Sequence, residues 1–179
     1  MSTQQVTQFL SLLTVAAQVF AGVILILFLF RGKKWLSRIL KYSLKLAFLV
    51  SLAATLGSLY YSDVAGFEPC KLCWYQRIFM YPQPFLYGLA LLKKDKRIVD
   101  YGILLSVIGA IIAGYHYLLQ VGVVPSLACE AVGYSASCSK RFVMTFGYIT
   151  IPMMALSAFL LITGLLLVLK YSSQRVGKK

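Results

Sequence analysis

The stretch Glu68-Pro69-Cys70-Lys71-Leu72-Cys73-Trp74-Tyr75-Gln76-Arg77 carries two cysteines three positions apart and an arginine four residues after the second. If a helix begins just before Cys70, then Cys73 and Arg77 are i,i+4 neighbours on one of its faces. Amide N–H groups at the helix start then point at the thiols. Both features favour the thiolate, which is the reactive form of cysteine. The stretch therefore predicts a site of thiol redox chemistry.

The sequence around this stretch is apolar enough to lie in a membrane. The chain of 179 residues is 60% hydrophobic, with a mean hydropathy of +0.79, outside the usual range of soluble domains. A membrane-spanning helix needs about 20 apolar residues. Five runs come near that length, at roughly Phe9–Phe30, Tyr42–Tyr61, Trp74–Leu92, Val99–Leu119 and Gly147–Leu169. We therefore expect a single all-α membrane domain over residues 1–179.

The net charge of +13 raises the question of nucleic-acid binding, but the placement of the basic residues indicates membrane topology instead. Most of them gather in residues 31–45, in residues 93–97 and in the tail 170–179. By the positive-inside rule these three clusters face the cytoplasm. The rule predicts an outside N-terminus, a cytoplasmic C-terminus and outside loops at 62–73 and 120–146. No nucleic-acid partner is expected.

Three of the segments carry local signals. The first run lacks the basic start and the 7–15-residue apolar region of a cleaved signal peptide, so we expect a retained helix. Pro82 and Pro84 are expected to kink the third run or divide it into two halves. Residues 140–146 mix basic and apolar side chains, so an amphipathic segment lying in the interface and an ordinary connecting loop are both open.

All four cysteines fall in the two predicted outside loops, and Cys70 with Cys73 and Cys129 with Cys138 are the obvious pairs. Structural staples are one alternative, but a C-x-x-C ring is too small to restrict much of the chain and suits a redox switch better. A four-thiolate zinc site is another, although the second spacing is wide for zinc. Haem attachment is disfavoured because Trp74 stands where C-x-x-C-H needs histidine. No metal is expected.

A dithiol–disulfide relay needs an electron acceptor, and the chain has no nucleotide-binding glycine motif. A lipid-dissolved acceptor suits so small a bundle. Arg77 either extends to phosphate headgroups or hydrogen-bonds a quinone carbonyl. His116, near the outer end of the fourth run, is either a packed interfacial residue or part of a quinone site.

Three groups of residues resemble one family. Pro-Cys-x-Leu-Cys-Trp-Tyr-Gln-Arg-Ile from Pro69, followed by Tyr81-Pro82, is similar to the signature of the DsbB family of membrane disulfide-forming oxidoreductases. Tyr115-His116-x-x-Leu119-Gln120 and Ile151-Pro152 resemble the same family, in the same order. The likeness covers roughly residues 42–169. It implies a four-helix transmembrane bundle, to which the helix at about residues 9–30 is an addition without an assigned role.

The resemblance implies a bacterial inner-membrane enzyme that oxidises a DsbA-like thioredoxin-fold partner and passes the electrons to ubiquinone or menaquinone. Carried over, Cys129 forms the mixed disulfide with the partner and Cys138 relays to Cys70. Cys73 and Arg77 then face the quinone. The C-x8-C spacing resembles short-loop members. Vitamin K epoxide reductase relatives have the loop pair before C-x-x-C, so the order here disfavours them.

The rival hypothesis is a membrane scaffold or metal-binding protein whose cysteines are structural.

Overall fold

The computed structural model describes residues 2–30, 33–95, 97–125 and 137–176, and these residues are almost entirely helical. Within them there is no strand, only an isolated bridge between Thr145 and Ile149. The elements in chain order are α1 (Thr3–Leu29), α2 (Lys33–Leu59), the π-helical turn η1 (Tyr60–Val64), α3 (Lys71–Met80), α4 (Pro82–Lys93), α5 (Ile98–Val121) and α7 (Ile151–Val176). The all-α prediction is confirmed.

Four of the described helices are long and apolar enough to cross a membrane, namely α1, α2, α5 and α7. They match four of the five predicted runs. The third run is divided, because α3 ends at Met80 and α4 begins at Pro82. Proline lacks an amide hydrogen and fits the first helical position, so it starts a new helix more readily than it continues one. The expected division at Pro82 is confirmed.

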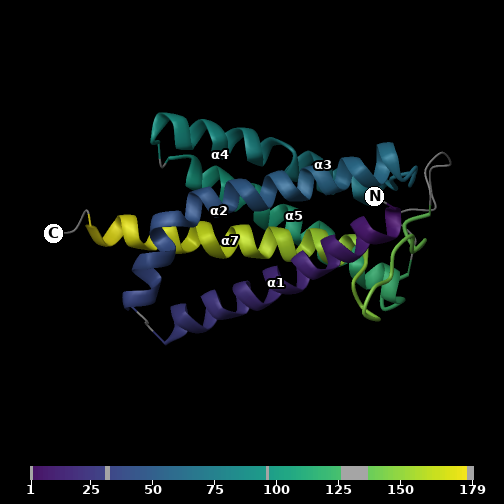
Figure 1. The fold of residues 1–179 in the computed structure, drawn as a ribbon. Coiled ribbons are helices and arrows are strands. Elements are labelled where there is room, and N and C mark those ends of the chain that lie inside the picture. The colour runs from purple at the N-terminus through teal and green to yellow at the C-terminus, as the bar shows by residue number, and fades with distance from the viewer. Residues whose placement is uncertain (1, 31–32, 96, 126–136, 177–179) are drawn as a thin grey trace.

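Helix α7 lies in the middle of the bundle and packs against α5, α2 and α1 (Figure 1). Helix α1 crosses α7 obliquely, and its C-terminal half diverges from α4 (Figure 1). The N-terminus, the start of α3 and the segment leading into α7 gather at one end of the bundle, and the C-terminus lies at the opposite end.

The last helix begins at Ile151 rather than at Gly147, where the predicted apolar run started. Phe146 and Gly147 have φ values of 53° and 78°, which a helix does not allow. Thr145 and Ile149 exchange two backbone hydrogen bonds of 2.9 Å across this turn. Residues 140–146 contain no helix and lead into this turn.

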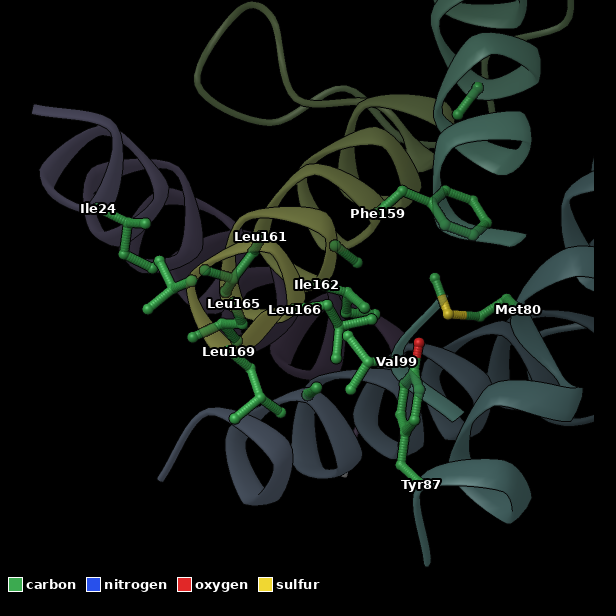
Figure 2. Close-up of a cluster of buried hydrophobic side chains, with 14 residues drawn as sticks. Ile24, Met80, Tyr87, Val99, Phe159, Leu161, Ile162, Leu165, Leu166 and Leu169 are labelled. Atoms are coloured by element: carbon green, nitrogen blue, oxygen red, sulfur yellow. The ribbon is translucent and has the colours of Figure 1, made fainter. Parts of the chain in front are cut away.

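The main core is built on α7, whose buried side chains meet those of the other helices (Figure 2). Phe159 is fully buried against α5, where a Cβ on Gly109 would lie 2.3 Å from its ring. Ile24 of α1 joins the same cluster. The additional N-terminal helix is therefore packed into the bundle rather than merely attached to it.

Candidate functional site

Cys70 is the N-cap of α3, so the helix begins where the sequence predicted. Its sulfur accepts a hydrogen bond from the Cys73 backbone N–H at 3.4 Å. The two Sγ atoms are 3.1 Å apart, and both cysteines are free thiols. An N-cap residue sits in front of unpaired amide groups and the positive end of the helix dipole. This position favours negative charge on Cys70.

The two thiols differ in acidity. A hydrogen bond from the Cys73 thiol, followed by one from His116, lowers the pKa of Cys70 well below its ordinary value, against the opposing effect of burial. The same bond and burial raise the pKa of Cys73, although the Arg77 charge acts in the opposite direction. The thiolate of the reduced pair therefore belongs to Cys70, while the proton stays on Cys73.

His116 lies directly against Cys70, from a position 46 residues further along the chain. The Gln76 side-chain amide donates to His116 Nδ1 at 2.8 Å and to the Leu72 carbonyl at 3.1 Å. Since an amide nitrogen only donates, Nδ1 is the acceptor and a neutral ring carries its hydrogen on Nε2. Nε2 lies 3.2 Å from the carbonyl of Cys138 and 3.6 Å from Cys70 Sγ.

Cys138 shares a small buried cluster with Cys70 and Leu119. It is disulfide-bonded and only 1% exposed. Its loop is tied to the end of α5, since Arg141 Nε donates to the Gln120 carbonyl at 2.7 Å. Cys129, its expected partner, lies outside the described residues. His116 thus connects the C-x-x-C pair to the backbone of the second cysteine loop.

A cavity of about 540 Å³ opens beside Cys73, lined mainly by apolar side chains of α1, α2, α3 and α7. Gln76 and Arg77 also line it, whereas Cys70 and His116 do not. Cys73 and Arg77 therefore share one helix face, as their spacing predicted. The sequence grouped His116 with Arg77 at a possible quinone site, whereas only Arg77 of the two lines this cavity.

The Arg77 side chain is fixed by α2. Its Nε donates to Ser58 Oγ at 3.1 Å and its Nη2 to the Ser58 carbonyl at 3.2 Å. Its guanidinium also lies 5.0 Å from the centre of the Trp74 ring. A guanidinium has five N–H donors, so it keeps some beyond those bound to Ser58. The contacts hold a positive donor group at the wall of the cavity.

Sequence reasoning missed Ser58 and Gln76 as residues of the site. Gln76 was within reach, because on a helix starting at Cys70 it lies three residues after Cys73 and one turn after Leu72. Ser58 had no such signal, since it lies 19 residues before Arg77 on another helix.

Cys70, Cys73 and His116 bring three possible metal-ligand atoms within 4.8 Å of one another, the one such group among the residues that the structure describes. The Nε2–H that faces Cys138 has no lone pair for a metal. Structural zinc usually takes four ligands, and this group supplies three. The arrangement suits a hydrogen-bonded dithiol better than a metal centre.

The comparisons with known proteins agree with this thiol chemistry. The family "Disulfide bond formation protein DsbB" matches residues 41–169. A "Probable disulfide formation protein C 1" of Bacillus anthracis is 47% identical over 68% of this chain and 87% of its own length. The "SPbeta prophage-derived disulfide bond formation protein B" of Bacillus subtilis is 44% identical over 78% of this chain and 93% of its own length.

A "Probable disulfide formation protein" of Coxiella burnetii is 41% identical over 76% of this chain and 93% of its own length. No solved structure matches the chain significantly. The matched region contains the C-x-x-C helix, His116 and the second cysteine loop. The chain therefore belongs to the DsbB family of disulfide bond formation proteins, and its role is in disulfide formation.

Proposed function

We propose that the protein is a thiol:quinone oxidoreductase that reoxidises a DsbA-like thioredoxin-fold partner and passes the electrons to a membrane quinone. The observation that carries the proposal is that Cys73 and the fixed donor group of Arg77 line the same apolar cavity. Its neighbour Cys70 is turned toward His116 and Cys138 instead. Cys73 thus passes electrons to the acceptor, and Cys70 exchanges with the second cysteine loop.

The cavity fits a quinone in size and chemistry. Ligand pockets usually measure about 300–1,000 Å³ and combine apolar walls with few polar groups. This one measures about 540 Å³, and Arg77 and Tyr81, joined through Ser58, form one polar group in its lining. A quinone ring needs donors for its carbonyl oxygens, and its isoprenoid tail needs apolar walls. Ubiquinone and menaquinone both meet this description.

The partner delivers electrons at the other cysteine pair. The partner's dithiol reduces the disulfide of Cys129 and Cys138. The reduced Cys129–Cys138 pair then reduces the Cys70–Cys73 disulfide. Burial of Cys138 supports assigning the partner's attack to Cys129. The proximity of Cys70 and Cys138 in one buried cluster supports exchange between the pairs.

The final step returns the C-x-x-C pair to its disulfide. The bound quinone takes two electrons from the two sulfurs, one proton from the Cys73 thiol and one from water, and leaves as the quinol. Cys73 supplies the sulfur at the cavity, and the Cys70 thiolate forms the new S–S bond with it. Arg77 stabilises the negative charge that develops on the quinone oxygen.

The positive-inside rule supports an orientation with the cysteine loops outside the cytoplasm. We place the protein in the bacterial inner membrane with its C-terminus in the cytoplasm. This orientation brings the cysteine loops to the compartment in which disulfides persist.

The test is turnover of the purified protein with a reduced thioredoxin-fold substrate, followed by the loss of quinone absorbance. We expect wild-type protein to oxidise the substrate and reduce one quinone for each disulfide formed. Cys73→Ser serves as the matched control and is expected to reduce none. If the wild-type protein reduces neither ubiquinone nor menaquinone, the proposal is wrong. If such a protein also carried stoichiometric zinc, the metal-binding hypothesis would replace it.

A further inference from the structure

Helix α1 has no role in the function as proposed so far. The family match begins at residue 41, so the whole of α1 lies outside it. Yet the helix is fastened beside the cavity. Gln18 donates to Ser157 Oγ of α7 at 2.9 Å and accepts from the Tyr148 hydroxyl at 2.9 Å. The Tyr61 hydroxyl donates to Thr7 Oγ1 at 3.3 Å.

One face of α1 lines the cavity with six side chains: Leu10, Leu13, Thr14, Ala16, Ala17 and Phe20. Leu12 and Val19 do not line the cavity and are 59% and 63% exposed, so another face of α1 points outward. Such an exposed apolar face suits lipid contact, because α1 is long and apolar enough to cross the membrane. Helix α1 therefore separates the cavity from the bilayer on this side.

Small residues of α1 and α2 form part of the cavity lining. Near its polar end the two helices approach closely, since a Cβ on Gly57 would lie 3.3 Å from a Leu10 methyl group. Further along α1, Ala16 and Ala17 line the cavity, as do Ala53 and Ala54 of α2. Leu13 lines this part and is still 43% exposed.

The cavity thus has a polar end and an apolar end. Ser58, Arg77 and Cys73 mark the first. Ala17 and Phe20 of α1, with Leu161 of α7, mark the second. An occupant that fits both ends carries a ring with hydrogen-bond acceptors and a long apolar tail.

We propose that α1 is an acceptor-binding element, and that its residues around Ala17 form the wall against which the isoprenoid tail of the quinone lies. The inference rests on the proposed function, because it assigns a further part of the same cavity. It makes the additional helix a determinant of acceptor affinity and of the tail length that the protein accepts.

The experiment compares Ala17→Phe with the matched control Val19→Phe, which adds the same side chain on the lipid-facing side of α1. Each variant is assayed with a tail-bearing quinone and with a tail-less analogue. When the tail occupies the cavity, a phenyl ring added at Ala17 overpacks the same space, and overpacking costs about 1–3 kcal/mol. We therefore expect Ala17→Phe to raise the KM for the tail-bearing quinone about tenfold or more. The KM for the tail-less analogue and the thiol exchange with the partner should stay within about twofold of wild type.

Equal KM values in Ala17→Phe and Val19→Phe overturn the inference while leaving the proposed function standing, provided that wild-type protein reduces quinone. A tenfold rise for both quinones also overturns it, because the tail is then not what Ala17 contacts. If Ala17→Phe does not fold, Leu13→Ala replaces it, with Leu12→Ala as the control. Because Leu13→Ala removes part of the apolar wall, it is then expected to raise the KM for the tail-bearing quinone but not the KM for the tail-less analogue.

Discussion

His116 Nε2 lies 3.6 Å from Cys70 Sγ, and both side chains are buried between α3 and α5. The histidine is held there by Gln76, which occupies its other nitrogen. Nε2, which lies 3.2 Å from the Cys138 carbonyl as well as 3.6 Å from the sulfur, is therefore held as the donor nitrogen before any thiolate forms. A preorganised donor stabilises a buried charge without having to reorient.

We expect the thiolate of reduced Cys70 to persist well below the ordinary pKa of a thiol, because hydrogen bonds from Cys73 and His116 lower its pKa. His116→Leu removes one donor and should shift the thiolate titration to higher pH. Ultraviolet absorbance of the thiolate measures this in protein reduced at the C-x-x-C pair. Ser106→Ala, a buried polar change elsewhere on α5, is the control. An identical titration in wild type and His116→Leu would contradict the assignment.

The same pKa direction predicts a pH dependence of stability. The folded pKa of Cys70 lies below that of the unfolded thiol. The thiolate therefore stabilises the reduced protein fully above the unfolded pKa, and this contribution is lost as pH falls through the folded pKa. Thermal unfolding of reduced wild-type protein should show this loss, and Cys70→Ala should not.

Arg77→Ala should raise the KM for quinone about tenfold or more, since hydrogen bonds to charged groups contribute about 1.5–3 kcal/mol. Arg77→His should weaken quinone binding as well, and both disulfides should still form in either variant. Lys71→Ala is the control, because Lys71 is a cation on α3 that does not line the cavity. Unchanged quinone kinetics in Arg77→Ala would reduce Arg77 to an interfacial anchor.

Cys138→Ala protein incubated with the oxidised partner should accumulate a mixed disulfide: the Cys129 thiolate attacks the partner's disulfide, the partner's other sulfur leaves as a thiolate, and Cys138 is no longer there to resolve the adduct. A non-reducing gel detects the adduct. Cys70→Ala should permit the first exchange but block transfer between the pairs, since Cys70 is the C-x-x-C cysteine in the buried cluster of Cys138. An adduct formed through Cys70 or Cys73 in otherwise wild-type protein would reverse the proposed relay.

The orientation is tested with single cysteines at Ser2 and Ser172 in a cysteine-free background. Because the basic clusters are expected in the cytoplasm, an impermeant maleimide should label position 2 on intact cells and leave position 172 unlabelled. Lysed cells provide the control in which both positions react. The reverse pattern on intact cells would overturn the orientation.

Gly109→Ala should destabilise the bundle by about 1–3 kcal/mol, since overpacking forces neighbouring side chains to move. The added Cβ would lie 2.3 Å from the Phe159 ring. Gly114→Ala on the same helix is the matched control, because its nearest neighbour is 4.0 Å away. In detergent, the unfolding temperature should fall for Gly109→Ala and stay level or rise for Gly114→Ala. Equal effects would contradict the role of this close approach.

The sequence by itself determined the features that depend on neighbours along the chain. Apolar run length predicted the four long helices, and Pro82 predicted the break between α3 and α4. Once a helix is assumed to start near Cys70, the shared face of Cys73 and Arg77 follows from helical spacing. These properties are local, so they hold wherever the segments pack.

Only the tertiary structure decided how those segments complete one another. It brought His116 to Cys70 from 46 residues away and Ser58 to Arg77 from 19 residues away. It also made α1 a wall of the cavity, which the length and hydropathy of its apolar run did not predict. The physical reason is that helix periodicity fixes which residues share a face, whereas packing between helices decides what that face meets.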